Sequence, residues 1–178
     1  MKRMFTLLLA SFALCGCAAV GNVTETVSET VSGVVTDLLD VFSKDHTAYV
    51  RESGHSLNCG STDKQMSVRL FLTKDEAKQW ETSRNLSLLK PGGGSYAYAL
   101  VDMGQQPTGG YGVLVSRKAE MSGDLLTLKA TLIQPEQGQV VSLASTNPCA
   151  LIVLPLGEYK QVEVKDQDGK LIATTAQK

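Results

Sequence analysis

The four cysteines have the widest chemistry of any residues in this chain, since a thiol can be acylated, paired in a disulfide, bound to a metal or used as a nucleophile. Cys15 and Cys17 lie close together near the start of the 178-residue chain, whereas Cys59 and Cys149 lie far apart. Redox and zinc sites often place two cysteines in a C-x-x-C motif, and this chain has none. The sequence predicts no metal site, because the two histidines lie in polar contexts without the spacing of zinc ligands.

The first 17 residues have the organisation of a bacterial targeting segment. A positively charged start is followed by an apolar run over residues 4–14 that is too short to span a bilayer. The string Leu14-Cys15-Gly16-Cys17 resembles the lipobox of bacterial lipoprotein precursors, in which a leucine lies three residues before the lipidated cysteine and a small residue lies immediately before it. The resemblance implies that residues 1–16 are removed as a signal peptide and that Cys17 is lipidated. An ordinary secretory peptide is the alternative, with cleavage near Ala18 or Ala19.

Ala18 follows the lipidation site, where lipoproteins retained in the inner membrane often carry aspartate. The resemblance therefore implies a lipid anchor in the outer membrane, facing the periplasm. No second apolar stretch approaches membrane-spanning length, so the acyl chains would be the only anchor. Removal of residues 1–16 takes away Lys2 and Arg3 and no acid, which changes the formal charge from −1 to −3. This mildly acidic balance disfavours nucleic acid as a partner.

Cys59 and Cys149 remain available once the other two cysteines are removed or acylated. An oxidising compartment favours a disulfide between them. The bond would close a loop of roughly 90 residues, which is worth on the order of 4 kcal/mol in the chain-entropy model. A redox or metal pair is the alternative interpretation.

Residues 17–47 are predicted to form a lipidated tether with an amphipathic helix. Apolar residues recur at helical steps between residues 23 and 42, at Val23, Val27, Val31, Val34, Leu38 and Phe42. The many β-branched residues make an isolated helix weak, so it needs a surface to lie on. The segment could also be a helix that binds a partner, but it lacks the basic residues of a membrane-surface helix.

Residues 48–178 are predicted to form one β-rich domain. Strands are expected at residues 66–72, 96–101, 111–116, 125–133, 150–154, 159–164 and 171–174, with short ones at 49–52 and 140–143. One helix is expected at residues 75–84, because Thr73 and Glu76 have the spacing of a capping box. A single helix among so many strands predicts a mainly antiparallel β-sandwich or a partly open barrel.

A conspicuous loop joins two of the expected strands and consists of Pro107, Thr108, Gly109, Gly110 and Tyr111. Proline presets one φ angle, and two successive glycines allow close approach of another backbone. Loops on a rigid β frame often carry binding, and an exposed tyrosine could serve as an anchor. The opposite interpretation is that both glycines serve only the turn and Tyr111 belongs to the core.

The same loop carries a resemblance to a known family when it is taken with its surroundings. The ordered pattern is a strand, a helix with a tryptophan, a strand ending in glycine, a P-T-G-G-Y loop, an extended strand, and a T-x-P segment before an apolar strand. The matching segments here are residues 68–72, 75–84 with Trp80, 98–104, 107–111, 125–135, and 146–148 before 151–154. This set resembles the C-terminal domain family named after PrcB, a lipoprotein subunit of a bacterial surface protease complex. The resemblance implies a fold and a setting, and it has no catalytic residues to carry over.

The leading function predicted from these features is a non-catalytic envelope lipoprotein that acts as an interaction or scaffolding subunit, with an envelope protein, such as a protease, as its partner. No G-x-S-x-G motif, cofactor motif or small-molecule site is evident, so no enzyme activity and no cofactor are predicted. Asp102 is the best single acid for a functional role, although a turn acceptor or a solvated strand-end acid explains it more simply. The alternative function is a protease inhibitor that presents residues 107–111, because this loop is similar to the N-P-T-T-G loop of chagasin-type inhibitors.

Overall fold

The computed structural model describes residues 46–91, 96–155 and 157–176, all within the unit Ser43–Lys178. The predicted signal peptide, Cys17 and the amphipathic segment at residues 23–42 lie outside the described residues. No helix among the residues described is long and apolar enough to cross a membrane.

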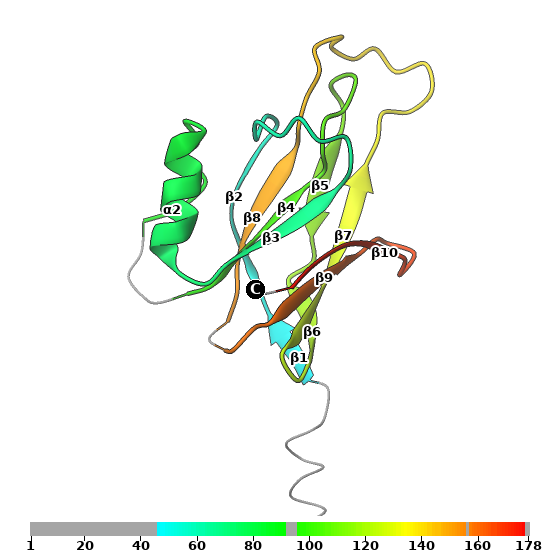
Figure 1. Ribbon diagram of the computed structural model, residues 1–178. Helices are drawn as coiled ribbons and strands as arrows, with labels where there is room; N and C mark the ends of the chain where they lie inside the picture. Colours follow the sequence, from blue (N-terminus) through cyan, green and yellow to red (C-terminus); the bar gives the residue numbers. More distant parts are fainter. Residues whose placement is uncertain (1–45, 92–95, 156, 177–178) are drawn as a thin grey trace, which may run out of the picture. The chain divides into compact units, whose positions relative to one another are not determined.

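Two β-sheets and one helix make up the described unit (Figure 1). The larger sheet has the order β1 (His46–Tyr49), β6 (Lys118–Ser122), β7 (Leu125–Ile133), β9 (Gln161–Lys165) and β10 (Leu171–Ala176), and β5 (Gly112–Val115) also pairs with β7. The smaller sheet has the order β2 (Arg51–Ser56), β8 (Cys149–Val153), β4 (Tyr98–Asp102) and β3 (Ser67–Phe71). Helix α2 (Lys74–Ser83) packs on its outer face. The predicted β-sandwich is confirmed, and no closed barrel forms among the described strands.

Strands β4 and β8 lie inside the smaller sheet and are buried along their whole length. Alternate residues of a strand point to opposite faces. Ala99 and Ile152 therefore face the core between the two sheets, whereas Leu100 and Leu151 face the second core under α2. This explains why residues 150–154 read as a continuous apolar run.

Strands β1 and β2 form almost one continuous strand that passes from one sheet to the other at Val50. β1 pairs with β6, and β2 pairs with β8. The Val50 side chain is buried at the crossing, and its backbone N–H donates to the carbonyl of Arg117 at 2.9 Å. The expected short strand at residues 49–52 is therefore part of a longer run that joins the sheets at one edge.

Side chains of α2 and of its N-cap residue bond to the backbone on both sides of the helix. Thr73 Oγ1 accepts from the N–H of Glu76 at 3.2 Å, as the capping box predicts, but the Glu76 carboxylate accepts from the N–H of Leu72 instead of that of Thr73. At the other end, the fully buried Glu81 carboxylate accepts from the N–H groups of Leu88 and Leu89. These bonds hold the segment after the helix against the sheet.

Three features differ from the expectations. Strand β6 was not predicted, the parallel pairing of β7 with β9 departs from an antiparallel arrangement, and residues 140–143 form a loop instead of a short strand. The last prediction is wrong because none of the described strands pairs with these residues, so their apolar side chains have no sheet face to cover.

Candidate functional site

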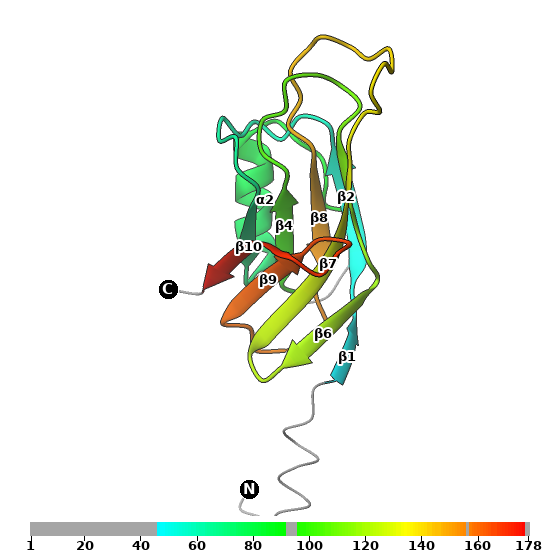
Figure 2. The same cartoon turned by 90° about the vertical axis from the view of Figure 1, so that its right-hand side faces the viewer.

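Two loops lie side by side at one end of the sandwich, where Figures 1 and 2 show them projecting beyond the strands. Loop 103–111 joins β4 to β5, and loop 134–148 joins β7 to β8. Gln106 and Thr146 form an isolated antiparallel bridge, with backbone N–H to carbonyl distances of 2.7 and 3.1 Å. Further out, the N–H of Gly109 donates to the carbonyl of Ser142 at 2.8 Å. We call this pair of segments the paired loops.

Side-chain hydroxyl groups add to the pairing. Thr146 Oγ1 donates to the carbonyl of Thr108 at 2.8 Å, and Ser145 Oγ donates to that of Gln106 at the same distance. Loop 103–111 is thus held along its length by loop 134–148. The backbone groups that bond the two loops to each other are therefore not free to bond to a partner.

The five predicted loop residues are brought to this surface. Pro107 and Gly110 are exposed, whereas Thr108, Gly109 and Tyr111 are half-buried. Tyr111 is therefore neither a core residue nor a fully exposed anchor.

The two glycines of loop 103–111 have different geometries. Gly110 has a φ of +84°, and a Cβ there would lie 3.0 Å from the Val141 side chain and 3.1 Å from that of Pro135. Glycine is needed at this position, as the turn interpretation expected. At Gly109 a Cβ would lie 3.3 Å from the Ser142 side chain, which is a tight contact without positive φ. Alanine substitutions at these positions would disturb the loop itself and are poor probes of binding.

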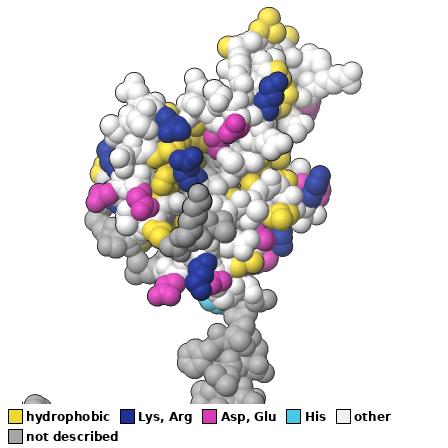
Figure 3. Space-filling view, viewed as in Figure 1, with side chains coloured by type: hydrophobic (Ala, Val, Ile, Leu, Met, Phe, Trp, Pro, Cys, Tyr) yellow, Lys and Arg dark blue, Asp and Glu magenta, His cyan; other side chains and the backbone are white. Residues whose placement is uncertain are grey.

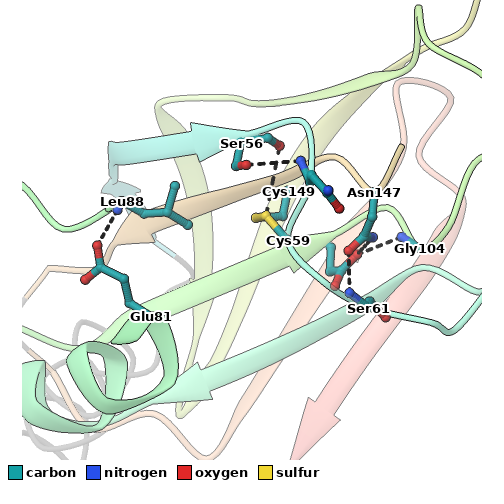
Figure 4. Close-up of a disulfide and its surroundings, with 10 residues drawn as sticks. Ser56, Cys59, Ser61, Glu81, Leu88, Gly104, Asn147 and Cys149 are labelled. Carbon is teal, nitrogen blue, oxygen red and sulfur yellow. Dashed lines mark hydrogen bonds between the residues drawn. A yellow bond between two sulfur atoms is a disulfide. The ribbon is translucent and has the colours of Figure 1, made fainter. Parts of the chain in front are cut away.

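A buried polar network supports the base of the paired loops (Figure 4). Asp102 Oδ1 accepts from the N–H of Gly104 at 2.8 Å and from Asn147 Nδ2 at 2.6 Å. Asn147 Oδ1 accepts from the N–H of Ser61 at 2.6 Å, which ties in the segment between β2 and β3. Asp102 therefore has the role of a turn acceptor, and with 6% of its surface exposed it is not a solvated acid.

Cys59 and Cys149 form a disulfide beside this network, with their Cα atoms 6.1 Å apart. The N–H of Cys59 also donates to the carbonyl of Asn147 at 2.9 Å. The bond thus joins the β2–β3 segment to the first residue of β8, which directly follows loop 134–148 in the chain (Figure 4). The predicted pairing is present in the structure.

The sequence analysis missed the most exposed apolar residues of this end. Val140 is 98% exposed and Leu143 is 88% exposed, and hydrophobic side chains are visible at the tip in Figure 3. The useful signal was the preceding stretch of proline, glycine and polar residues at 134–139, which favours a loop over a strand. An exposed apolar pair on a supported loop is suited to burial against a protein partner.

No group of three or more histidine, cysteine, aspartate or glutamate side chains within the described ranges could hold a metal ion. At the base of the paired loops, the buried Asp102 carboxylate is occupied by hydrogen bonds from Gly104 and Asn147. The paired loops thus offer an exposed apolar surface, and the disulfide fixes the segment beneath them.

Comparison with known proteins gave one family match. The model described as "PrcB C-terminal" matches residues 97–155, which run from the start of β4 to just beyond β8 and include both paired loops. Comparisons with curated proteins and with solved structures found no match. The family match covers the later part of the sequence resemblance, from residue 98 onward, and does not include the strand at 68–72 or the helix at 75–84. The chain accordingly contains a PrcB C-terminal-like domain.

Proposed function

We propose that this protein is a non-catalytic interaction or scaffolding subunit of an envelope complex, anchored by lipid at Cys17 in the outer membrane and facing the periplasm. The observation that carries the proposal is the near-complete exposure of Val140 and Leu143 on a loop fastened to its neighbour and to a disulfide-linked base. Burial of such side chains by a partner is favourable, and the fixed loop loses little conformational freedom on binding. The PrcB resemblance favours a protease complex as the setting.

A binding experiment in envelope extracts tests the contact surface. The tagged full chain is cross-linked and captured as wild type, as a Val140→Ser/Leu143→Ser variant, and as a Tyr49→Ser control. Tyr49 is 70% exposed on β1, so the control also removes an exposed large apolar group, but away from the paired loops. Exposed substitutions of this kind change stability by less than about 0.5 kcal/mol, so all three proteins should fold.

We expect the wild type and the control to capture the same envelope protein, and the loop variant to capture at least about tenfold less. Equal capture by all three proteins would show that the paired loops are not the contact surface. If the captured protein is a protease, its activity in the complex separates the two candidate functions. Retained activity supports scaffolding, whereas inhibition that depends on the paired loops supports the protease inhibitor.

The lipid anchor is tested separately by metabolic labelling with a fatty-acid analogue. The wild-type chain is expected to carry the label and to fractionate with the outer membrane. A Cys17→Ser variant should lose the label, because serine lacks the thiol that is acylated. Label that persists in the Cys17→Ser variant would contradict the anchor, as would a wild-type chain found free in the periplasm.

A further inference from the structure

A second surface, separate from the paired loops, lies between α2 and the edge strand β3. Seven residues line a shallow groove of about 440 Å³ there: Arg69, Phe71, Glu76, Gln79, Trp80, Ser83 and Arg84. Two largely buried rings lie at its floor: Phe71 is 5% exposed, Trp80 is 7% exposed, and their ring centroids lie 5.9 Å apart. Figure 3 shows basic side chains beside hydrophobic surface on this face.

The two arginines belong to the same end of the groove. Arg69 lies two residues before Phe71 on β3, on the same outer face of the strand, and Arg84 lies one turn after Trp80 at the end of α2. The helix runs back alongside the sheet after β3 (Figure 1), so the positions of Arg69 and Arg84 both lie further from the β3–α2 turn than those of Phe71 and Trp80. Glu76 lies in the first turn of α2, at the opposite end, and its carboxylate caps the helix through the N–H of Leu72.

Arg84 is held in place before any ligand arrives. Its guanidinium carbon lies 4.9 Å from the centre of the Trp80 ring, and Nη1 donates to Ser83 Oγ at 3.2 Å. Its aliphatic stem lies beside Gly60 of the disulfide-bonded segment. No carboxylate within the described residues forms an ion pair with Arg69 or Arg84.

We infer that this groove binds an acidic peptide segment of a partner protein, with one carboxylate at Arg69 and Arg84 and a neighbouring apolar side chain at the small exposed part of Trp80. Guanidinium groups pair with carboxylates through two parallel hydrogen bonds, and an arginine stacked on a ring loses less freedom when it does so. In an extended peptide, residues two apart share a face, so the fitting pattern is an apolar residue and an acid separated by one position. The inference deepens the proposed interaction function by naming the chemistry of a partner.

Ligand binding to the groove can be followed through the fluorescence of Trp80, which lines it. Trp80 is the only tryptophan of the chain, so its fluorescence reports on this site alone. The probe is a labelled twelve-residue peptide with three repeats of Ser-Leu-Ser-Glu and an amidated C-terminus. A peptide in which lysine replaces each glutamate is the matched probe. Both are titrated against the detergent-solubilised full chain, with peptide anisotropy and Trp80 emission as independent readouts.

We expect saturable binding of the acidic peptide with a change in Trp80 emission, and binding of the lysine peptide at least tenfold weaker. An Arg69→Gln/Arg84→Gln variant should also bind the acidic peptide at least tenfold more weakly. An Arg117→Gln control removes a positive charge from the β5–β6 connection and should bind as the wild type does. Circular dichroism of each variant verifies folding.

Equal binding of both peptides would overturn the inference, as would binding unaffected in the Arg69→Gln/Arg84→Gln variant or no saturable binding at all. The Val140→Ser/Leu143→Ser variant should bind the acidic peptide as the wild type does. This comparison distinguishes a loss of peptide binding at the groove from a loss of partner binding at the paired loops.

Discussion

Replacing Cys59 and Cys149 by alanine is expected to lower the free energy of unfolding by about 4 kcal/mol, because the disulfide restricts a chain segment of 90 residues in the unfolded state. Both cysteines are 1% exposed and pack in the core under α2, so the double variant also loses some packing. A loss of this size should lower Tm by more than about 10 °C. Urea denaturation and calorimetry of the oxidised wild type and the variant measure the effect.

The matched control is the wild-type chain after reduction, which removes the bond and keeps the side chains. We expect its stability to lie close to that of the alanine variant, with any remaining difference due to packing. A Tm shift below about 2 °C in both samples would contradict a stabilising role for the disulfide.

The second large effect is expected for Asp102→Ala. The substitution removes the acceptor shared by the Gly104 N–H and Asn147 Nδ2, and it leaves both donors unpaired at a buried position. A buried unpaired donor costs about 1–3 kcal/mol, so the loss of two such bonds should lower the free energy of unfolding by about 2–6 kcal/mol. Hydrogen exchange at the Gly104 amide should accelerate, because this amide loses its partner.

An exchange of the two polar residues serves as the control for Asp102→Ala. The Asp102→Asn/Asn147→Asp variant keeps one acceptor and one donor type at the two positions and should recover part of the lost stability. If Asp102→Ala unfolds within about 0.5 kcal/mol of the wild type, the network does not support the paired loops. The paired loops would then be held by their backbone pairing, the Thr146 and Ser145 hydroxyl bonds and the disulfide below them.

Local patterns in the sequence predicted the elements that are determined locally. The spacing of Thr73 and Glu76 marked the start of α2, and nine residues of alternating and apolar character marked β7. The apolar run at residues 150–154 indicated a strand covered on both faces, and β8 has a core on each side. These features follow from propensity, capping and burial within one segment.

The missed features depend on neighbours that are distant in the sequence. Strand β6 buries Ala119 and Met121. Its other residues are charged or polar, and such residues give only a weak strand signal in the sequence. The parallel pairing of β7 with β9 is set by the path of the chain through residues 134–160, which no local pattern encodes. Parallel neighbours require such a long connection.

The candidate site was predicted only in part for the same reason. Residues 107–111 stood out because proline and paired glycines are unusual together. The apolar residues Val140 and Leu143 predict a strand in sequence, because apolar residues without a known neighbour look the same in a strand and in an exposed loop. The bond between Asp102 and Asn147 joins residues 45 positions apart, and it could be recognised only once β4 and β8 were adjacent.

The position of the disulfide also affects what a proteolytic cut would do to the molecule. The exposed stretch 136–140 of loop 134–148 is accessible to an endopeptidase, and it lies between the two bonded cysteines. A single cleavage there would leave β8, β9 and β10 on one fragment and the preceding strands on the other, with Cys59 and Cys149 still joining them. After such a nick at the paired loops, the two fragments would remain one covalently connected molecule.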